Sequence, residues 1–177
     1  MIDIKSEKRN THTLVLFAVY LLALVWLILF KLQFSIAVMD EGRVVNLVPL
    51  LGSFDNNGVI RFSEIRNNIL VFIPLGIYIC MLKNKWSFAK KVLATVVLTL
   101  AFEITQFIFA IGRADITDVF SNTLGGVIGM GIYALLFKLM KGRTNKVLNV
   151  LAAVLTALAI LFVFLLLVIN HRWVRIK

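Results

Sequence analysis

The sequence predicts an all-α, polytopic helical membrane protein with about five transmembrane helices and a cytoplasmic N-terminus. Hydrophobic residues make up 60% of the 177 residues, which is more apolar surface than a soluble core of this size can bury. The apolar residues lie in five long runs, and a helix that spans a bilayer needs roughly 20 such residues. The length suits a single transmembrane domain over residues 1–177.

The helices are expected at five apolar runs, 13–30, 69–82, 92–111, 119–139 and 147–169. The first run is longer than a signal-peptide core and lacks a small-residue cleavage site, so we expect it to be retained. The second run is short, and we expect its helix to begin a turn or two earlier, near Ser63 or Arg66. Pro74 cannot donate to the carbonyl of Leu70, which predicts a kink in that helix.

Basic residues predict the orientation of the chain. Eleven of the nineteen Lys and Arg residues precede the first run or lie in the connections 83–91 and 138–146. Cytoplasmic connections carry such an excess, which places the N-terminus inside and the C-terminus outside. The net charge of +10 is therefore explained by the basic residues of the cytoplasmic connections, and we expect no nucleic-acid partner.

Residues 31–68 form one long external connection between the first two helices. Its segment Asp55-Asn56-Asn57-Gly58 is a strong turn signal. Apolar residues such as Leu47 and Leu50 also occur in it. A freely solvated linker would be more polar, so we expect this connection to fold back on the helices.

A carboxylate in the third apolar run is the residue most informative about function. Glu103 lies near the middle of residues 92–111, where a charge costs roughly 2.5–3.5 kcal/mol on insertion scales. It should therefore face protein or water and have a polar partner. The candidate partners are Gln106, Arg113, Asp115, Asp118 and Asn122.

The start of the fourth helix carries a polar stripe. Asp115, Asp118 and Asn122 are spaced i, i+3 and i+7, which places them on one helix face. Asp115 or Thr117 is expected to cap this helix, with Asp118 in its first turn. Capping explains one acid but not the whole set. The same stripe continues into small residues that suit close helix packing, Gly125 and Gly129.

The start of the second helix adds two candidates for ligand binding. Arg66 at the membrane surface suits a phosphate or carboxylate group, and the side chain of Asn68 or Asn67 would line the interior. The candidate ligand-binding residues are therefore Arg66, Asn68, Glu103, Gln106, Arg113, Asp115, Asp118 and Asn122. His12 and His171 lie outside the apolar runs without ligand spacing, so no metal site is expected from them and no resident cofactor is implied.

The order of the polar residues is informative in itself. Asn46-x-x-Pro49 precedes Arg66-Asn67-Asn68 and Pro74-Leu75-Gly76, and Glu103-x-x-Gln106 precedes Arg113, Asp115, Asp118 and Asn122-Thr123-Leu124-Gly125. This order resembles the VanZ-like family of small bacterial membrane proteins over about residues 46–131. The resemblance implies a multi-pass protein of the bacterial plasma membrane, associated with resistance to the lipoglycopeptide antibiotic teicoplanin. The resemblance implies no established enzymatic reaction.

Three hypotheses for function follow. In the first, an outward-facing polar site among the second, third and fourth helices binds a membrane lipid, a lipid-linked cell-wall precursor or a lipoglycopeptide, and so confers or modulates resistance. In the second, an enzyme modifies a polyprenyl- or phospholipid-linked head group, with Glu103 as acid or base and Asp115 and Asp118 holding a divalent cation. In the third, the protein is a structural partner of another membrane protein.

Overall fold

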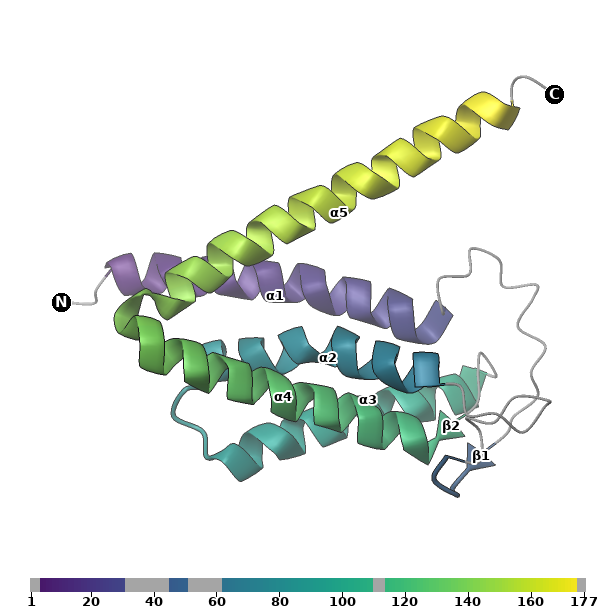
Figure 1. The fold of residues 1–177 in the computed structure, drawn as a ribbon, viewed down its shortest axis with the longest axis horizontal. Helices are drawn as coiled ribbons and strands as arrows, with labels where there is room; N and C mark the ends of the chain where they lie inside the picture. The colour runs from purple at the N-terminus through teal and green to yellow at the C-terminus, as the bar shows by residue number, and fades with distance from the viewer. Residues whose placement is uncertain (1–3, 31–44, 51–61, 110–113, 175–177) are drawn as a thin grey trace.

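The computed structural model describes residues 4–30, 45–50, 62–109 and 114–174 (Figure 1). The described residues form five α-helices: α1 (Ile4–Phe30), α2 (Phe62–Leu82), α3 (Phe88–Phe109), α4 (Ile116–Met140) and α5 (Thr144–Val174). A short 3-10 helix, η3 (Lys141–Arg143), joins α4 to α5. Two two-residue strands, β1 (Val45–Asn46) and β2 (Ala114–Asp115), pair in parallel. The prediction of an all-α fold is confirmed.

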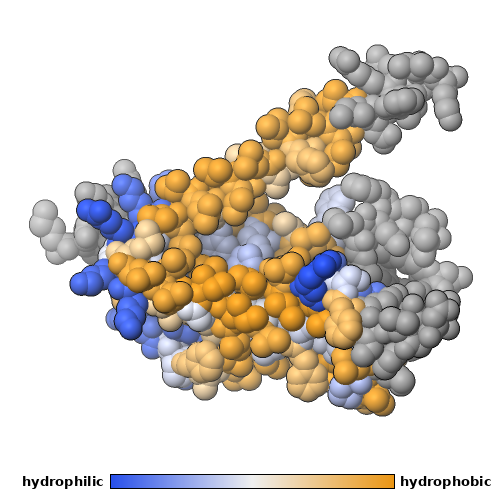
Figure 2. All heavy atoms as spheres, in the orientation of Figure 1, coloured by the Kyte–Doolittle hydropathy of each residue, from blue (hydrophilic) through white to orange (hydrophobic). Residues whose placement is uncertain are grey.

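The helices have the length and composition of membrane spans. Four stretches of the described chain are apolar enough to cross a membrane: 11–28, Phe62–Leu82, Phe88–Phe109 and Ile116–Val168. The last is 53 residues long and contains both α4 and α5, separated by η3. Figure 2 shows apolar residues over the flanks of the molecule and along α5, with hydrophilic residues gathered at the end where η3 lies. The number of spans and the orientation of the N-terminus stay predictions.

Helices α1 to α4 lie side by side, and α5 diverges from them (Figure 1). The start of α5 is held against α1, because Nδ2 of Asn149 donates to Oγ1 of Thr13 at 2.8 Å. Further along α5, residues 157–168 are exposed within the chain. The second helix begins at Phe62, one residue before the earlier of its two predicted starts.

Helices α2 and α4 approach so closely that their backbones touch. A Cβ atom at Gly125 or Gly129 of α4 would collide with the backbone of α2, and one at Gly76 of α2 would collide with the backbone of α4. Apolar surface provides little driving force for association in lipid, so small residues that permit close packing hold such helices together. The predicted packing role of the two α4 glycines is confirmed.

The apolar core lies between α1, α2 and α3, and its buried residues are Leu24, Phe72, Leu75, Ile79 and Phe102. Pro74 lies inside α2 and removes one backbone donor from that helix. Tyr20 of α1 reaches the same part of α2, where its hydroxyl donates to the carbonyl oxygen of Val71 at 2.7 Å. This hydrogen bond fixes α1 against α2 beside the proline.

Candidate functional site

The predicted polar residues gather mainly at one end of the bundle. The end of α3, the starts of α2 and α4, and the two strands meet there (Figure 1). We call the residues that form hydrogen bonds in this region the polar cluster: Asn46, Asn68, Thr99, Glu103, Asp115, Thr117, Asp118 and Asn122.

The described part of the long connection folds back onto this cluster. Strand β1 pairs with β2 and places Asn46 opposite Asp115. Nδ2 of Asn46 donates to Oδ2 of Asp115 at 2.9 Å, and Oδ1 of Asn46 accepts from the backbone N–H of Val48 at 3.1 Å. The backbone N–H of Leu50 donates to Oγ1 of Thr117 at 2.9 Å. The predicted return of the connection is confirmed for residues 45–50, and its other predicted features lie outside the described residues.

Both aspartates connect the start of α4 to neighbouring elements. Asp115 is the N-cap of α4, and its Oδ1 accepts from the backbone N–H of Thr117 at 2.7 Å. Asp118 lies in the first turn, and its Oδ1 accepts from Nδ2 of Asn68 on α2 at 2.7 Å. The predicted cap and first-turn positions are both confirmed.

Glu103 is buried, with only 6% of its surface exposed. Its Oε2 accepts a hydrogen bond from the backbone N–H of Asp115 at 2.8 Å. Asp115 is among the predicted partners, but it contributes its amide, because two carboxylate side chains repel each other. A donor to the charged oxygen compensates part of the cost of burying it. Arg113, another of the candidate partners, lies outside the described residues.

Two buried amides lie near Glu103 and contact different helices. Nε2 of Gln106 donates to the carbonyl oxygen of Ile28 on α1 at 3.0 Å, so Gln106 contacts α1. Nδ2 of Asn122 donates to Oγ1 of Thr99 at 2.7 Å. Within the described chain, Oε1 of Gln106 and Oδ1 of Asn122 have no hydrogen-bond donor. A buried acceptor left in this way costs about 1–3 kcal/mol.

Sequence reasoning missed Thr99 and did not include Asn46 among the site residues. A signal for Thr99 existed, because Thr95, Thr99, Glu103 and Gln106 recur at helical spacing along α3 and are all buried. Polar residues on one face of an apolar helix predict an interhelical polar face. The signal for Asn46 was its place in the Asn46-x-x-Pro49 motif.

The candidate Arg66 lies outside the polar cluster. Arg66 is exposed near the start of α2, and its Nη2 lies 3.5 Å from Oδ1 of Asn67. Among the residues that the structure describes, no group of three or more His, Cys, Asp and Glu side chains is placed to hold a metal ion. The cluster is thus a hydrogen-bonded set of carboxylates, amides and hydroxyls, and among the described residues Arg66 provides an exposed guanidinium near the start of α2.

Removal of the Asp115 side chain should destabilise the start of α4. We expect Asp115→Ala to lower the free energy of unfolding by about 1–2 kcal/mol, the cost of losing an N-cap. Glu64→Ala is the control, because Glu64 is an exposed acid in the first turn of α2. Unfolding by SDS in mixed micelles measures the free energy of unfolding of both variants. Equal losses in the two would contradict a specific role for the cap.

The family follows from comparison with known proteins. The model of the VanZ/LLP1 family matches residues 17–141. This chain belongs to the VanZ/LLP1 family. It is also 41% identical over 157 residues to Protein VanZ of Enterococcus faecium, covering 86% of this chain and 89% of that protein. No solved structure matches the chain.

The VanZ/LLP1 match extends beyond the region that the motifs indicated. Residues 17–141 include the second half of α1, all of α2, α3 and α4, and the first residue of η3, whereas the motifs cover about 46–131. The whole polar cluster lies inside the match. Helix α5, which diverges from the bundle, lies outside it.

Proposed function

We propose that this VanZ/LLP1 protein is a multi-pass protein of the bacterial plasma membrane that modulates resistance to teicoplanin-like lipoglycopeptides by binding a lipid-linked head group at the polar cluster. One observation carries the proposal: polar side chains from α2, α3 and α4 converge at one end of an apolar bundle, and Glu103, Asp115 and Asn122 are buried among them. Ionisable groups in a membrane span are costly, and they usually mark a functional site. The similarity to Protein VanZ supports the resistance setting.

The chemistry of the cluster suits a head group rich in hydroxyls and amides. Carboxylates accept strong hydrogen bonds from such groups, and Oδ1 of Asn122 is a further acceptor in the cluster to which no described residue donates. Arg66, exposed near the start of α2, would hold a phosphate or carboxylate of the same ligand. A ligand with a lipid tail suits this position, because the helices of the bundle have the apolar composition of membrane spans.

The hydrogen bonds favour binding over catalysis with a divalent cation. Both carboxylate oxygens of Asp115 accept from protein donors, one from Asn46 and one from Thr117. Oδ1 of Asp118 accepts from Asn68. A cation bound at these oxygens would compete with the bonds that hold β1 and α2 against α4.

Loss of charge at the cluster should remove protection without removing the protein. We expect Glu103→Gln and Asp118→Asn, made separately, to lower the teicoplanin concentration that the host tolerates. Each variant keeps the side-chain shape and loses its charge. Roughly ten-fold lower protection corresponds to a loss of about 1.4 kcal/mol of binding. The measurement is growth inhibition of a susceptible host that expresses each variant.

Glu64→Gln is the matched control, because Glu64 is exposed on α2, and it should protect as well as the unmodified protein. Membrane levels are compared by immunoblotting. Full protection by both cluster variants at equal membrane levels would refute the proposal.

A further inference from the structure

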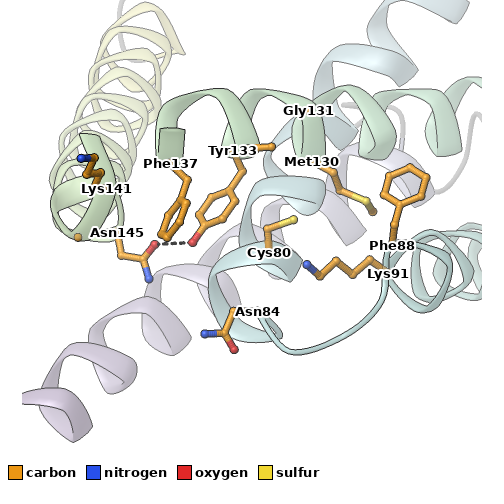
Figure 3. Close-up of a pocket in the computed structure, with 12 residues that line it drawn as sticks. Cys80, Asn84, Phe88, Lys91, Met130, Gly131, Tyr133, Phe137, Lys141 and Asn145 are labelled. Atoms are coloured by element: carbon orange, nitrogen blue, oxygen red, sulfur yellow. Dashed lines mark hydrogen bonds between the residues drawn. The ribbon is translucent and has the colours of Figure 1, made fainter. Parts of the chain in front are cut away.

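A second polar region lies at the opposite end of the bundle, where a cavity of about 620 Å³ opens between α2, α3 and α4 (Figure 3). Its size is within the range of pockets that hold small ligands. Polar and apolar side chains line it together, including Asn84, Phe88, Lys91, Phe137, Lys141 and Asn145. No described residue of the polar cluster contributes to it.

The lining of this cavity is cationic. Lys91, in the first turn of α3, is partly buried, and in Figure 3 its amino group points toward Cys80 of α2. Lys141 lies at the far edge, in η3. None of the described lining residues is acidic. A partly buried ammonium group in a lining without carboxylates favours an anionic ligand.

The connection between α2 and α3, which contributes Asn84 to this cavity, carries residues typical of the membrane surface. In the connection between α2 and α3, Nζ of Lys83 lies 5.4 Å from the ring centre of Trp86. Tryptophan and lysine together are typical of the layer where membrane meets water. Phe88 and Phe137 add apolar walls to the same cavity. Its lining thus combines cationic and apolar parts, as the junction of a head group with its acyl chains requires.

We propose that this cavity binds the phosphate-bearing head group of an anionic membrane lipid, with Lys91 as its principal contact. Basic pockets between membrane helices recognise such head groups by charge. The hydroxyl of Tyr133 donates to Oδ1 of Asn145 at 3.0 Å (Figure 3). This bond orients the amide nitrogen of Asn145 as a donor, and the amide of Asn84 provides a second donor. The site is separate from the polar cluster, so the two are testable independently.

Lipid competition on the purified full-length protein tests this proposal. The protein in detergent is mixed with equal amounts of phosphatidylglycerol and phosphatidylcholine, and bound lipids are counted by native mass spectrometry. We expect phosphatidylglycerol to dominate and Lys91→Gln to reduce its preference roughly five-fold, the effect of one basic residue near an anionic lipid. Lys91→Arg should retain the preference. Lys90→Gln is the matched control, because Lys90 is exposed and outside the lining.

A single symmetric peak on size-exclusion chromatography establishes that each variant is folded. If Lys91→Gln fails this criterion, Lys141→Gln and its neighbour control Lys138→Gln provide the same comparison. Equal binding of the two lipids, or equal losses in a lining variant and its control, would overturn the proposal. Displacement of phosphatidylglycerol by soluble glycerol phosphate at equal concentration would also overturn it, because the cavity would then take a soluble phosphate rather than a lipid.

Discussion

Substitution of Gly129 by alanine is expected to destabilise the protein strongly, whereas substitution of Gly131 by alanine is expected to be tolerated. A Cβ atom at Gly129 would collide with the carbonyl oxygen of Ile73 and lie 3.2 Å from Cα of Gly76. Backbone atoms cannot rotate away, so α2 and α4 must separate, at a cost of about 1–3 kcal/mol. A Cβ atom at Gly131 meets nothing within 4 Å.

The two alanine variants form a matched pair. Both replace a glycine inside α4, so both gain the same helix propensity of about 1 kcal/mol. The difference between them therefore measures the contact of α4 with α2. SDS-driven unfolding in mixed micelles gives the midpoints, and the fraction of monodisperse protein gives a second readout. Equal midpoints would show that the backbones of α2 and α4 do not touch at Gly129.

Replacement of Glu103 by leucine is expected to abolish protection against teicoplanin while the protein stays in the membrane at a normal or higher level. Removal of a carboxylate from an apolar span eases insertion by roughly 2.5–3.5 kcal/mol. The hydrogen bond from Asp115 that is lost is worth about 1.5–3 kcal/mol, because one partner is charged. Insertion therefore becomes easier while one contact of the folded protein is lost, and the charge needed by the proposed site is gone.

The control for this variant is Ile104→Leu, an apolar exchange at the neighbouring position, where the side chain is 57% exposed. Growth inhibition by teicoplanin and membrane level are measured for both. Loss of protection in Glu103→Leu alone supports the binding site. Full protection by Glu103→Leu would instead identify Glu103 as a structural contact between α3 and the start of α4, as the third hypothesis requires.

The helices were the most predictable part of the fold. Within lipid every backbone polar group must be satisfied inside the chain, so long apolar runs leave few alternatives to helices. The polar start of α2, the cap at Asp115 and the packing of Gly125 and Gly129 also followed from local rules. Each of these features depends on residues close together in the sequence.

The partners of the polar side chains were less predictable, because they depend on long-range arrangement. The donor to Glu103 is a backbone amide in β2, a strand that exists only by pairing with β1, and the Asn46–Asp115 bond joins residues 69 positions apart. Gln106 reaches Ile28, which is 78 positions away. Helical spacing predicts which face of α3 is polar, but it does not say which neighbouring helix covers that face. The apolar composition of α5 does not predict that this helix diverges from the other four.

Because β1 pairs with β2, the position of the long connection is thermodynamically coupled to the capping of the first turn of α4. A molecule that displaces β1 must break the bonds from Asn46 to Asp115 and from Leu50 to Thr117, and so weakens the cap of α4. By thermodynamic reciprocity, a ligand that prefers the capped turn also retains β1 in place. The rate of amide hydrogen exchange at Leu50 would therefore report head-group occupancy without any label on the ligand.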